Sequence, residues 1–125
     1  MKKLLFWGLF VLVITVYSCT NRKEVVEYPT VTLCDTTSSR FSVEVKDVFD
    51  RNCNRCHSAS VANTLGGGTN LQNYAMVRAY ATSGILIANI TFAPSGNPMP
   101  KGGSKIPDCD INKIRAWINR GSLNN

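Results

Sequence analysis

Apolar residues recur at the spacing of one helix face beyond the first third of the chain. The first such pattern follows Ser42, an expected helix cap, and its buried face would consist of Val45, Val48 and Phe49. This helix is expected to run into Cys53. Alternation typical of a strand does not occur over a convincing length, so the pattern predicts a mostly helical domain.

Two shorter helices are expected in the middle of the chain. Asn73 is expected to cap a helix over residues 74–82, Gly84 to end it, and residues 85–90 to form a further helical turn. Residues 60–70 include three consecutive glycines among small polar residues. They are expected to form a loop whose backbone can approach another group closely.

A loop rich in proline precedes the last expected helix. Residues 91–107 hold four prolines and three glycines, which disfavour regular structure. Either Asp108 or Asp110 is then expected to cap a final helix that ends before Gly121. The apolar stripe of that helix contains Ile111, Ile114 and Ile118, with Trp117 beside it.

The N-terminal segment has the pattern of an export signal. Lys2 and Lys3 precede an apolar run over residues 4–17, which is shorter than the roughly 20 apolar residues of a membrane-spanning helix. We therefore expect residues 1–18 to be removed on export. Retention of the run as an anchor is the alternative.

The end of this apolar run resembles the bacterial lipobox, in which a cysteine becomes the lipidated first residue of the mature chain. The residues that carry the resemblance are Val16, Tyr17, Ser18 and Cys19. An ordinary cysteine behind the signal is the alternative. Residues 19–33 are mostly polar and lack an apolar period, so they are expected to form a flexible tether, and residues 34–125 the domain.

Composition and charge fit one small globular domain. The 125 residues include 44% hydrophobic and 18% charged residues, which leaves no room for a second catalytic domain. The formal charge of +6 falls to about +4 without Lys2 and Lys3. Because the basic residues are scattered, nucleic-acid binding is not expected, whereas steering toward an acidic partner is compatible with this charge.

The most specific chemical signal is the motif Cys53-Asn54-Arg55-Cys56-His57. Two thiols separated by two residues can each add to one vinyl group of a porphyrin, and a histidine directly after them is held beneath the iron. Attachment at two points also lowers the entropic cost of keeping ligand and iron together. The motif therefore predicts one covalent haem c on Cys53 and Cys56, with His57 as the proximal iron ligand.

Two other kinds of site also use a cysteine pair. Four thiolates could bind zinc, but two of them would come from isolated single cysteines, whereas paired zinc motifs bring a second close pair. A thioredoxin-like pair would need a βαβ context, which the pattern does not offer. The haem assignment leaves no cysteine over, because Cys19 would carry lipid and Cys34 and Cys109 would form a disulfide.

The distal iron ligand must come from outside the motif, because His57 is the only histidine. Methionine is the natural candidate. Met76 falls within an expected helix, where packing in the core is the favoured role. Met99 lies between two prolines, which bar a helix and present the thioether in one direction. Met99 is therefore the expected distal ligand, and a merely packed or exposed Met99 is the alternative.

The distal ligand decides the class of function. An iron closed by His57 and Met99 suits electron transfer, whereas an open sixth position suits a haem peroxidase or a gas sensor. A zinc or disulfide module without haem is a third possibility. Because the chain has no second histidine to serve as a distal acid–base group, it is not expected to be an enzyme.

From Phe41 onward, a helix leading into CxxCH, a methionine loop and a terminal helix with Trp117 resemble the class I cytochrome c family. Within it the chain looks most like small bacterial lipoprotein cytochromes, on the stretches Met99-Pro100-Lys101-Gly102-Gly103, Asp108-Cys109-Asp110 and Ile114-Arg115-Ala116-Trp117-Ile118. The resemblance implies an all-α fold of three to four helices around the haem. It also implies crossed first and last helices, with His57 proximal and Met99 distal.

The resemblance further implies an electron shuttle. With a lipid on Cys19, the protein is expected to be exported and held by a membrane on the periplasmic side or in the cell envelope. Its expected partners are therefore that membrane and other redox proteins, and it would act as a relay beside a membrane enzyme.

Overall fold

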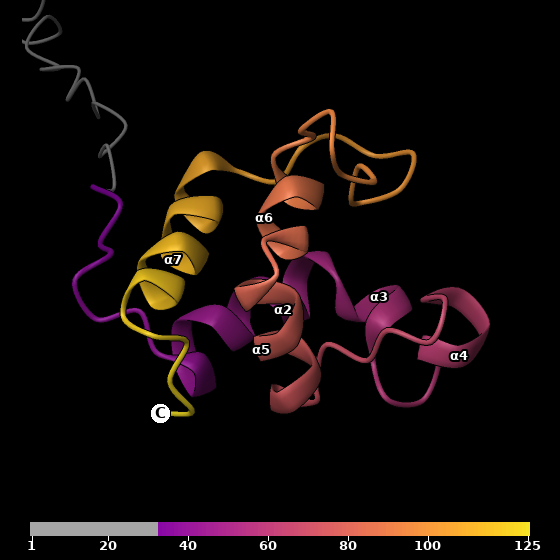
Figure 1. Ribbon diagram of the computed structural model, residues 1–125, viewed down its shortest axis with the longest axis horizontal. Coiled ribbons are helices and arrows are strands. Elements are labelled where there is room, and N and C mark those ends of the chain that lie inside the picture. The colour runs from indigo at the N-terminus through magenta and orange to yellow at the C-terminus, as the bar shows by residue number, and fades with distance from the viewer. Residues whose placement is uncertain (1–32) are drawn as a thin grey trace, which may run out of the picture. The chain divides into compact units, whose positions relative to one another are not determined.

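The computed structural model describes residues 33–125, which form a short π-helix and six α-helices and contain no strand (Figure 1). The expected all-α class is confirmed. The helices are η1 (Phe41–Val45), α2 (Lys46–Asn52), α3 (Asn54–His57), α4 (Ala62–Leu65), α5 (Tyr74–Thr82), α6 (Ile85–Ile90) and α7 (Asp108–Asn119). Within the described range, none of these helices has the length and apolar character needed to cross a membrane. The expected signal, Cys19 and nearly all of the tether lie outside the described residues.

The first helix begins differently from the expected pattern, because Ser42 does not cap it. The N–H groups of Phe41 and Ser42 donate instead to the side-chain and main-chain oxygens of Asn125, at 2.9 and 2.8 Å. The N–H of Arg40 donates to the carboxylate of Glu44 at 2.8 Å. Asn125, far away in the sequence, thus provides two acceptors that a local cap would otherwise give, and Glu44 within η1 provides a third. No break separates η1 from α2.

The middle helices lie where the sequence predicts them. The Asn73 side chain accepts a hydrogen bond from the Met76 N–H at 3.0 Å, so Asn73 is the cap of α5. Gly84 has a φ of 79°, which favours glycine where the chain turns from α5 into α6. The expected loop over residues 60–70 is wrong in part, since it includes the single helical turn α4. Four residues are too few for an apolar period to reveal a helix.

The start of α7 also differs from the expected pattern. Neither Asp108 nor Asp110 is its cap, because Pro107 occupies that position and both aspartates lie in the first helical turn. Their carboxylates are bound elsewhere, Asp108 by Lys105 and Asp110 by Arg51. They remain in the turn where negative charge is favourable to the helix dipole.

Gly121 ends α7 as predicted. Its φ is 93°, and its N–H donates to the Ile118 carbonyl at 2.9 Å. The N–H of Ser122 donates to the Trp117 carbonyl at 3.1 Å. This pair of bonds is the Schellman motif of a helix C-terminus, in which a left-handed glycine is strongly favoured.

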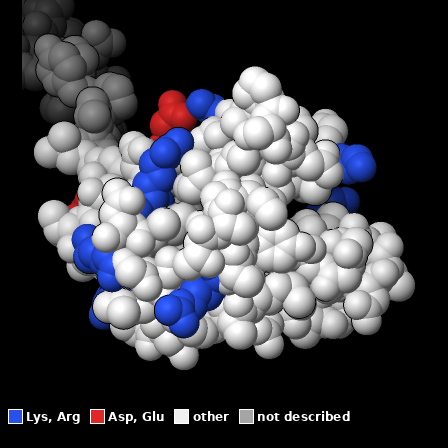
Figure 2. Space-filling view, in the orientation of Figure 1, with Lys and Arg blue, Asp and Glu red and all other residues white. Residues whose placement is uncertain are grey.

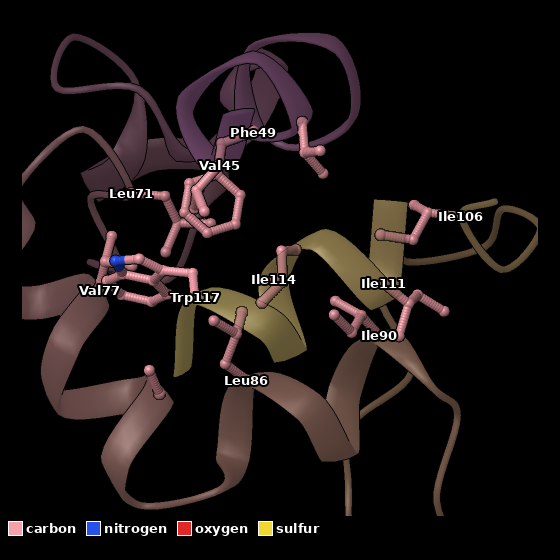
Figure 3. Packing of buried hydrophobic residues seen from close by; sticks show 12 residues of the cluster. Val45, Phe49, Leu71, Val77, Leu86, Ile90, Ile106, Ile111, Ile114 and Trp117 are labelled. Atoms are coloured by element: carbon pink, nitrogen blue, oxygen red, sulfur yellow. The ribbon is translucent and has the colours of Figure 1, made fainter. Parts of the chain in front are cut away.

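One hydrophobic cluster joins the helices. Figure 3 shows its labelled members, which come from η1, α2, α5, α6, α7 and the intervening segments: Val45, Phe49, Leu71, Val77, Leu86, Ile90, Ile106, Ile111, Ile114 and Trp117. Trp117 is only 1% exposed, and its indole N–H donates to the Leu123 carbonyl at 2.8 Å. Ile118 is only partly buried. Trp117, predicted to flank the apolar stripe of α7, is therefore one of its buried members.

Residues 34–39, which precede η1, are bonded to both ends of α7. Cys34 forms a disulfide with Cys109, in the first turn of α7. At the other end of the helix, the Arg120 guanidinium donates to the main-chain oxygens of three residues of that segment, namely Thr36, Thr37 and Ser39. The disulfide and these three bonds hold the start of the domain against its last helix.

Candidate functional site

The CxxCH motif forms a tight turn at the end of α2. The N–H of Cys53 still donates to the Phe49 carbonyl at 2.8 Å, which continues the helix up to the first thiol. The N–H groups of Cys56 and His57 both donate to the Cys53 carbonyl at 3.0 Å. A single turn around this carbonyl therefore presents both thiols and the imidazole.

Both thiols of the motif are free and half-buried. Burial raises the pKa of the Cys53 thiol to about 12, and the negative charge of Asp110 adds to the effect. The Cys53 thiol is therefore protonated at neutral pH, whereas a redox-active CxxC pair typically has a lowered thiol pKa. Together with the all-helical fold of residues 33–125, this argues against a thioredoxin-like pair.

The imidazole of His57 is oriented by the main chain of the next loop. Its Nδ1 lies 2.9 Å from the Thr69 carbonyl oxygen, and a carbonyl accepts, so Nδ1 carries the proton and Nε2 has a free lone pair. The carbonyl of His57 accepts the Leu71 N–H at 2.8 Å. A histidine fixed in this tautomer has the arrangement usual for a metal ligand, in which the second ring nitrogen binds a protein acceptor.

Gly66 lies directly behind this histidine. A Cβ atom at Gly66 would be 2.8 Å from the His57 Nδ1 and 2.6 Å from the Cys56 carbonyl oxygen, both too close for a side chain. The expectation that the backbone of residues 60–70 approaches another group closely therefore holds here. The group that it approaches is the histidine of the motif.

Met99 lies in the loop over residues 91–107, which has no regular structure, as expected. Asn89, near the end of α6, holds this loop twice: its main-chain oxygen accepts the Met99 N–H at 3.1 Å and its side-chain oxygen accepts the Asn97 N–H at 2.7 Å. Gly96 packs on the same helix, since a Cβ there would lie 2.5 Å from the Ala88 carbonyl oxygen. The loop is thus fixed to α6 on both sides of Pro98.

The loop with Met99 and the turn with His57 border the same part of the surface. In the view of Figure 1, the loop over residues 91–107 and the helices α3 and α4 project from the core toward the same side. Figure 2 shows the surface hollowed between these two parts. Met99 itself is half-buried.

Met76 does not have the role expected from the sequence. It is half-buried and is not a member of the hydrophobic cluster. Its sulfur accepts a hydrogen bond from the Asn70 N–H, with 2.9 Å between nitrogen and sulfur. The prediction of core packing is therefore wrong, because α5 turns this side chain toward the loop that orients His57.

The zinc alternative loses two of its four thiolates, because Cys34 and Cys109 are joined in a disulfide. Among residues 33–125, no group of three or more His, Cys, Asp or Glu side chains is arranged to hold a metal ion. Two free thiols on one turn, followed by a histidine with a free Nε2, fit a covalently attached haem instead.

Three residues that hold the site were not found from the sequence. Thr69 and Asn89 act largely through main-chain oxygens, which every residue type has, so no residue pattern identifies them. Gly66 had a partial signal in the run of three glycines. That run indicates close backbone approach without naming the group that is approached.

Comparison with known proteins matches a family model to this chain. The family model described as cytochrome c matches residues 42–122, which is more than half of the chain and includes the CxxCH motif, the methionine loop and α7. No curated protein and no solved structure shows a significant similarity. The chain therefore belongs to the cytochrome c family.

Proposed function

We propose that this protein is a membrane-tethered electron carrier with a single haem c. Membership of the family supplies the coarser part of this statement, an electron-transfer protein with covalent haem. In our proposal the haem is attached to Cys53 and Cys56, and its iron is bound by His57 and Met99. The tether is a lipid on Cys19, which rests on the lipobox-like sequence alone.

The hydrogen bond between His57 and Thr69 carries the proposal for the proximal side. Because Nδ1 donates to the Thr69 carbonyl at 2.9 Å, the ring is held in the tautomer that directs Nε2 to a metal. Cys53 and Cys56 contribute two thiols on the same turn as this ring. When bound, the haem supplies one-electron chemistry at its iron, and these three residues bind and orient it.

The distal ligand is proposed from the contrast between the two methionines of the domain. Met76 already has its sulfur in a hydrogen bond with the Asn70 N–H. Met99 lies in a loop that Asn89 and the adjacent prolines fix in position. A thioether held in this way would bind the haem iron, and an iron with two protein ligands would favour outer-sphere electron transfer over peroxidase or gas chemistry.

Charge distribution favours an acidic redox partner. From Asn52 to Pro107 the chain contains no Asp or Glu but four basic residues, namely Arg55, Arg78, Lys101 and Lys105. All four are exposed. In Figure 2 the carboxylates visible on this face lie at the left, and none lies over the right part with α3 and α4. The part of the chain that carries the site thus presents positive charge to a partner.

The test compares spectra of the purified mature protein and two variants. Haem staining after denaturation and the pyridine haemochrome of the wild type measure covalent attachment and the number of haems. We expect Met99→Ala to convert low-spin iron to high-spin iron, and Met76→Leu, the matched control, to leave the spin state unchanged. An unchanged spectrum for Met99→Ala would reject Met99 as the ligand and favour an open-site function.

A separate experiment tests the anchor. Cells fed a radioactive fatty acid should label the wild-type protein and not Cys19→Ser, and only the wild type should stay with the membrane fraction. The colour of the same preparation tests the haem: colourless protein from a host competent for haem attachment would favour a module without haem over an electron carrier.

A further inference from the structure

We propose that Tyr80 and Met76 of α5 are positioning residues for the proximal ligand. They hold residues 69–71, and this segment sets the hydrogen bond to the His57 imidazole and, through it, the reduction potential. The inference rests on the proposed function, because it takes His57 as an iron ligand.

Residues 69–71 bind His57 at two points. The Thr69 carbonyl oxygen lies 2.9 Å from the His57 Nδ1, and the Leu71 N–H donates to the His57 carbonyl oxygen at 2.8 Å. One bond fixes the ring and the other fixes the main chain that carries it. A shift of this segment therefore changes the length or angle of the Nδ1–H bond.

The same segment is bonded to α5 at two further points. The Thr69 hydroxyl lies 3.0 Å from the Tyr80 hydroxyl, and the Asn70 N–H donates to the Met76 sulfur at 2.9 Å. Met76 and Tyr80 are four residues apart, so they share one face of the helix. Each of the first two residues of the segment thus has a partner on α5.

Helix α5 is a firm support for these two bonds. Asn73 caps its start. Val77 and Ala81, one residue after each of the two positioning side chains, are buried in the hydrophobic cluster, and Tyr80 packs against it. Because packed cores resist small displacements, α5 holds residues 69–71 in a fixed position.

The direction of the effect follows from ligand chemistry. A stronger hydrogen bond from Nδ1 makes the imidazole a more basic ligand, which stabilises oxidised iron and lowers the reduction potential. Loss of either support should weaken this bond and raise the potential. We expect about a threefold change in the ratio of reduced to oxidised protein, which is roughly 28 mV at 59 mV per tenfold for one electron.

Three substitutions test the hydroxyl support and the sulfur support separately. Tyr80→Phe and Thr69→Val each remove one hydroxyl of the same pair and keep most of the side-chain volume, and Met76→Leu removes the sulfur. We expect each single variant to raise the potential of the holoprotein. The double variant Tyr80→Phe/Thr69→Val should match the single variants, because all three lack the same bond.

Tyr74→Phe is the matched control. Tyr74 lies on the same helix, but its hydroxyl donates to the Ser122 carbonyl at 2.7 Å, away from residues 69–71. We expect this variant to lower the free energy of unfolding and to leave the potential unchanged. An equal potential shift in Tyr74→Phe would assign the effect to general loosening and overturn the proposal.

Amide hydrogen exchange gives a readout that does not depend on the potential. The Asn70 and Leu71 amides should exchange faster in Tyr80→Phe and Met76→Leu than in the wild type and in Tyr74→Phe.

Unchanged potentials in Tyr80→Phe and Met76→Leu, with the low-spin spectrum intact, would overturn the positioning role alone. A wild type without low-spin iron bound by histidine and methionine would overturn the proposed function as well.

Discussion

The guanidinium of Arg51 lies against the carboxylate of Asp110, with N–O distances of 3.1 and 3.2 Å for the two parallel bonds. The same carboxylate accepts the Asn52 side-chain amide at 3.2 Å. Arg51 and Asn52 are the last residues of α2, directly before Cys53, and Asp110 lies in the first turn of α7. This bidentate pair therefore joins the helix that leads into the haem motif to the terminal helix.

The first prediction concerns the charge of Asp110. Its side chain is 7% exposed, so Asp110→Asn removes a buried charge without changing the shape of the side chain. We expect the free energy of unfolding, measured by urea denaturation, to fall by about 1.5 kcal/mol, the lower end for hydrogen bonds to charged groups because Arg51 is half-exposed.

The matched control is Asp47→Asn. Asp47 binds the same guanidinium at 2.9 Å, but its side chain is 59% exposed. Solvent screening should limit its loss to below about 0.5 kcal/mol. Equal losses in the two variants would contradict the argument from burial.

The helix ends show which features of the fold can be predicted from the sequence and which cannot. The bounds of α5 and α6 and the end of α7 follow from apolar spacing, Asn73 and glycine, all of which act within a few residues. The expected caps Ser42, Asp108 and Asp110 were wrong: Pro107 caps α7, Asp108 pairs with Lys105 close by, and distant partners engage the start of η1 and Asp110. Asn125 supplies the acceptors at η1, and Arg51 binds Asp110.

The site divides in the same way. Cys53, Cys56 and His57 could be assigned to one site because they are almost consecutive, and their spacing itself defines the chemistry. The bond from His57 to Thr69 spans 12 residues and uses a main-chain oxygen, so no residue type in the sequence indicates it. Met76 looked like a core residue because the pattern gives the helix but not the loop that packs on it.

The second prediction concerns Gly66. A methyl group at this position would lie 2.8 Å from the His57 Nδ1 and 2.6 Å from the Cys56 carbonyl oxygen, and neither belongs to a flexible side-chain end. We expect Gly66→Ala to lower the free energy of unfolding by about 1–3 kcal/mol, as overpacking does. We also expect a lower yield of haem-containing protein.

Gly103→Ala is the control for this change. A Cβ at Gly103 would meet its nearest neighbour, the Pro100 Cβ, at an ordinary 3.5 Å. Haem content and stability should stay close to those of the wild type. A normal haem yield and stability in Gly66→Ala would mean that the backbone around Gly66 and His57 shifts without cost to accommodate the methyl group.

The third prediction concerns the disulfide. Cys34 and Cys109 are 75 residues apart in sequence, so their bond restricts the unfolded chain strongly. Cys34→Ser/Cys109→Ser should lower the free energy of unfolding by about 2–4 kcal/mol while the haem spectrum is retained. Unchanged stability would show that the hydrogen bonds of Arg120 alone hold residues 34–39 on α7.

The fourth prediction concerns the hydrogen bonds by which α6 holds the loop over residues 91–107, which contains Met99. Asn89→Ala removes the side-chain bond to the Asn97 N–H and keeps the main-chain bond to Met99. A lost hydrogen bond of about 1 kcal/mol should make Met99 easier to displace, so imidazole should bind the oxidised iron roughly fivefold more tightly. Asn112→Ala, an exposed position on α7, should leave imidazole affinity unchanged, and equal affinities in all three proteins would reject the role of Asn89.

The fifth prediction concerns the basic residues between Asn52 and Pro107. This part of the chain contains no carboxylate of its own, and of its four basic residues only Lys105 is paired within residues 33–125, with Asp108. Electron transfer with the anion hexacyanoferrate should therefore slow as ionic strength rises, whereas transfer with the cation hexaammineruthenium should accelerate.

One pair of variants locates the charge that is responsible for this salt dependence. Lys101 is two residues from Met99, is exposed, and forms no ion pair within the described residues. Lys46, on α2, is paired with Asp50. At low salt Lys101→Gln should slow the reaction with hexacyanoferrate by about twofold or more. Lys46→Gln removes the same charge but should have a smaller effect, because Lys46 begins α2, about two helical turns before Cys53. If the rate is independent of salt, or if Lys46→Gln has the larger effect, partners do not approach through the carboxylate-free part of the chain.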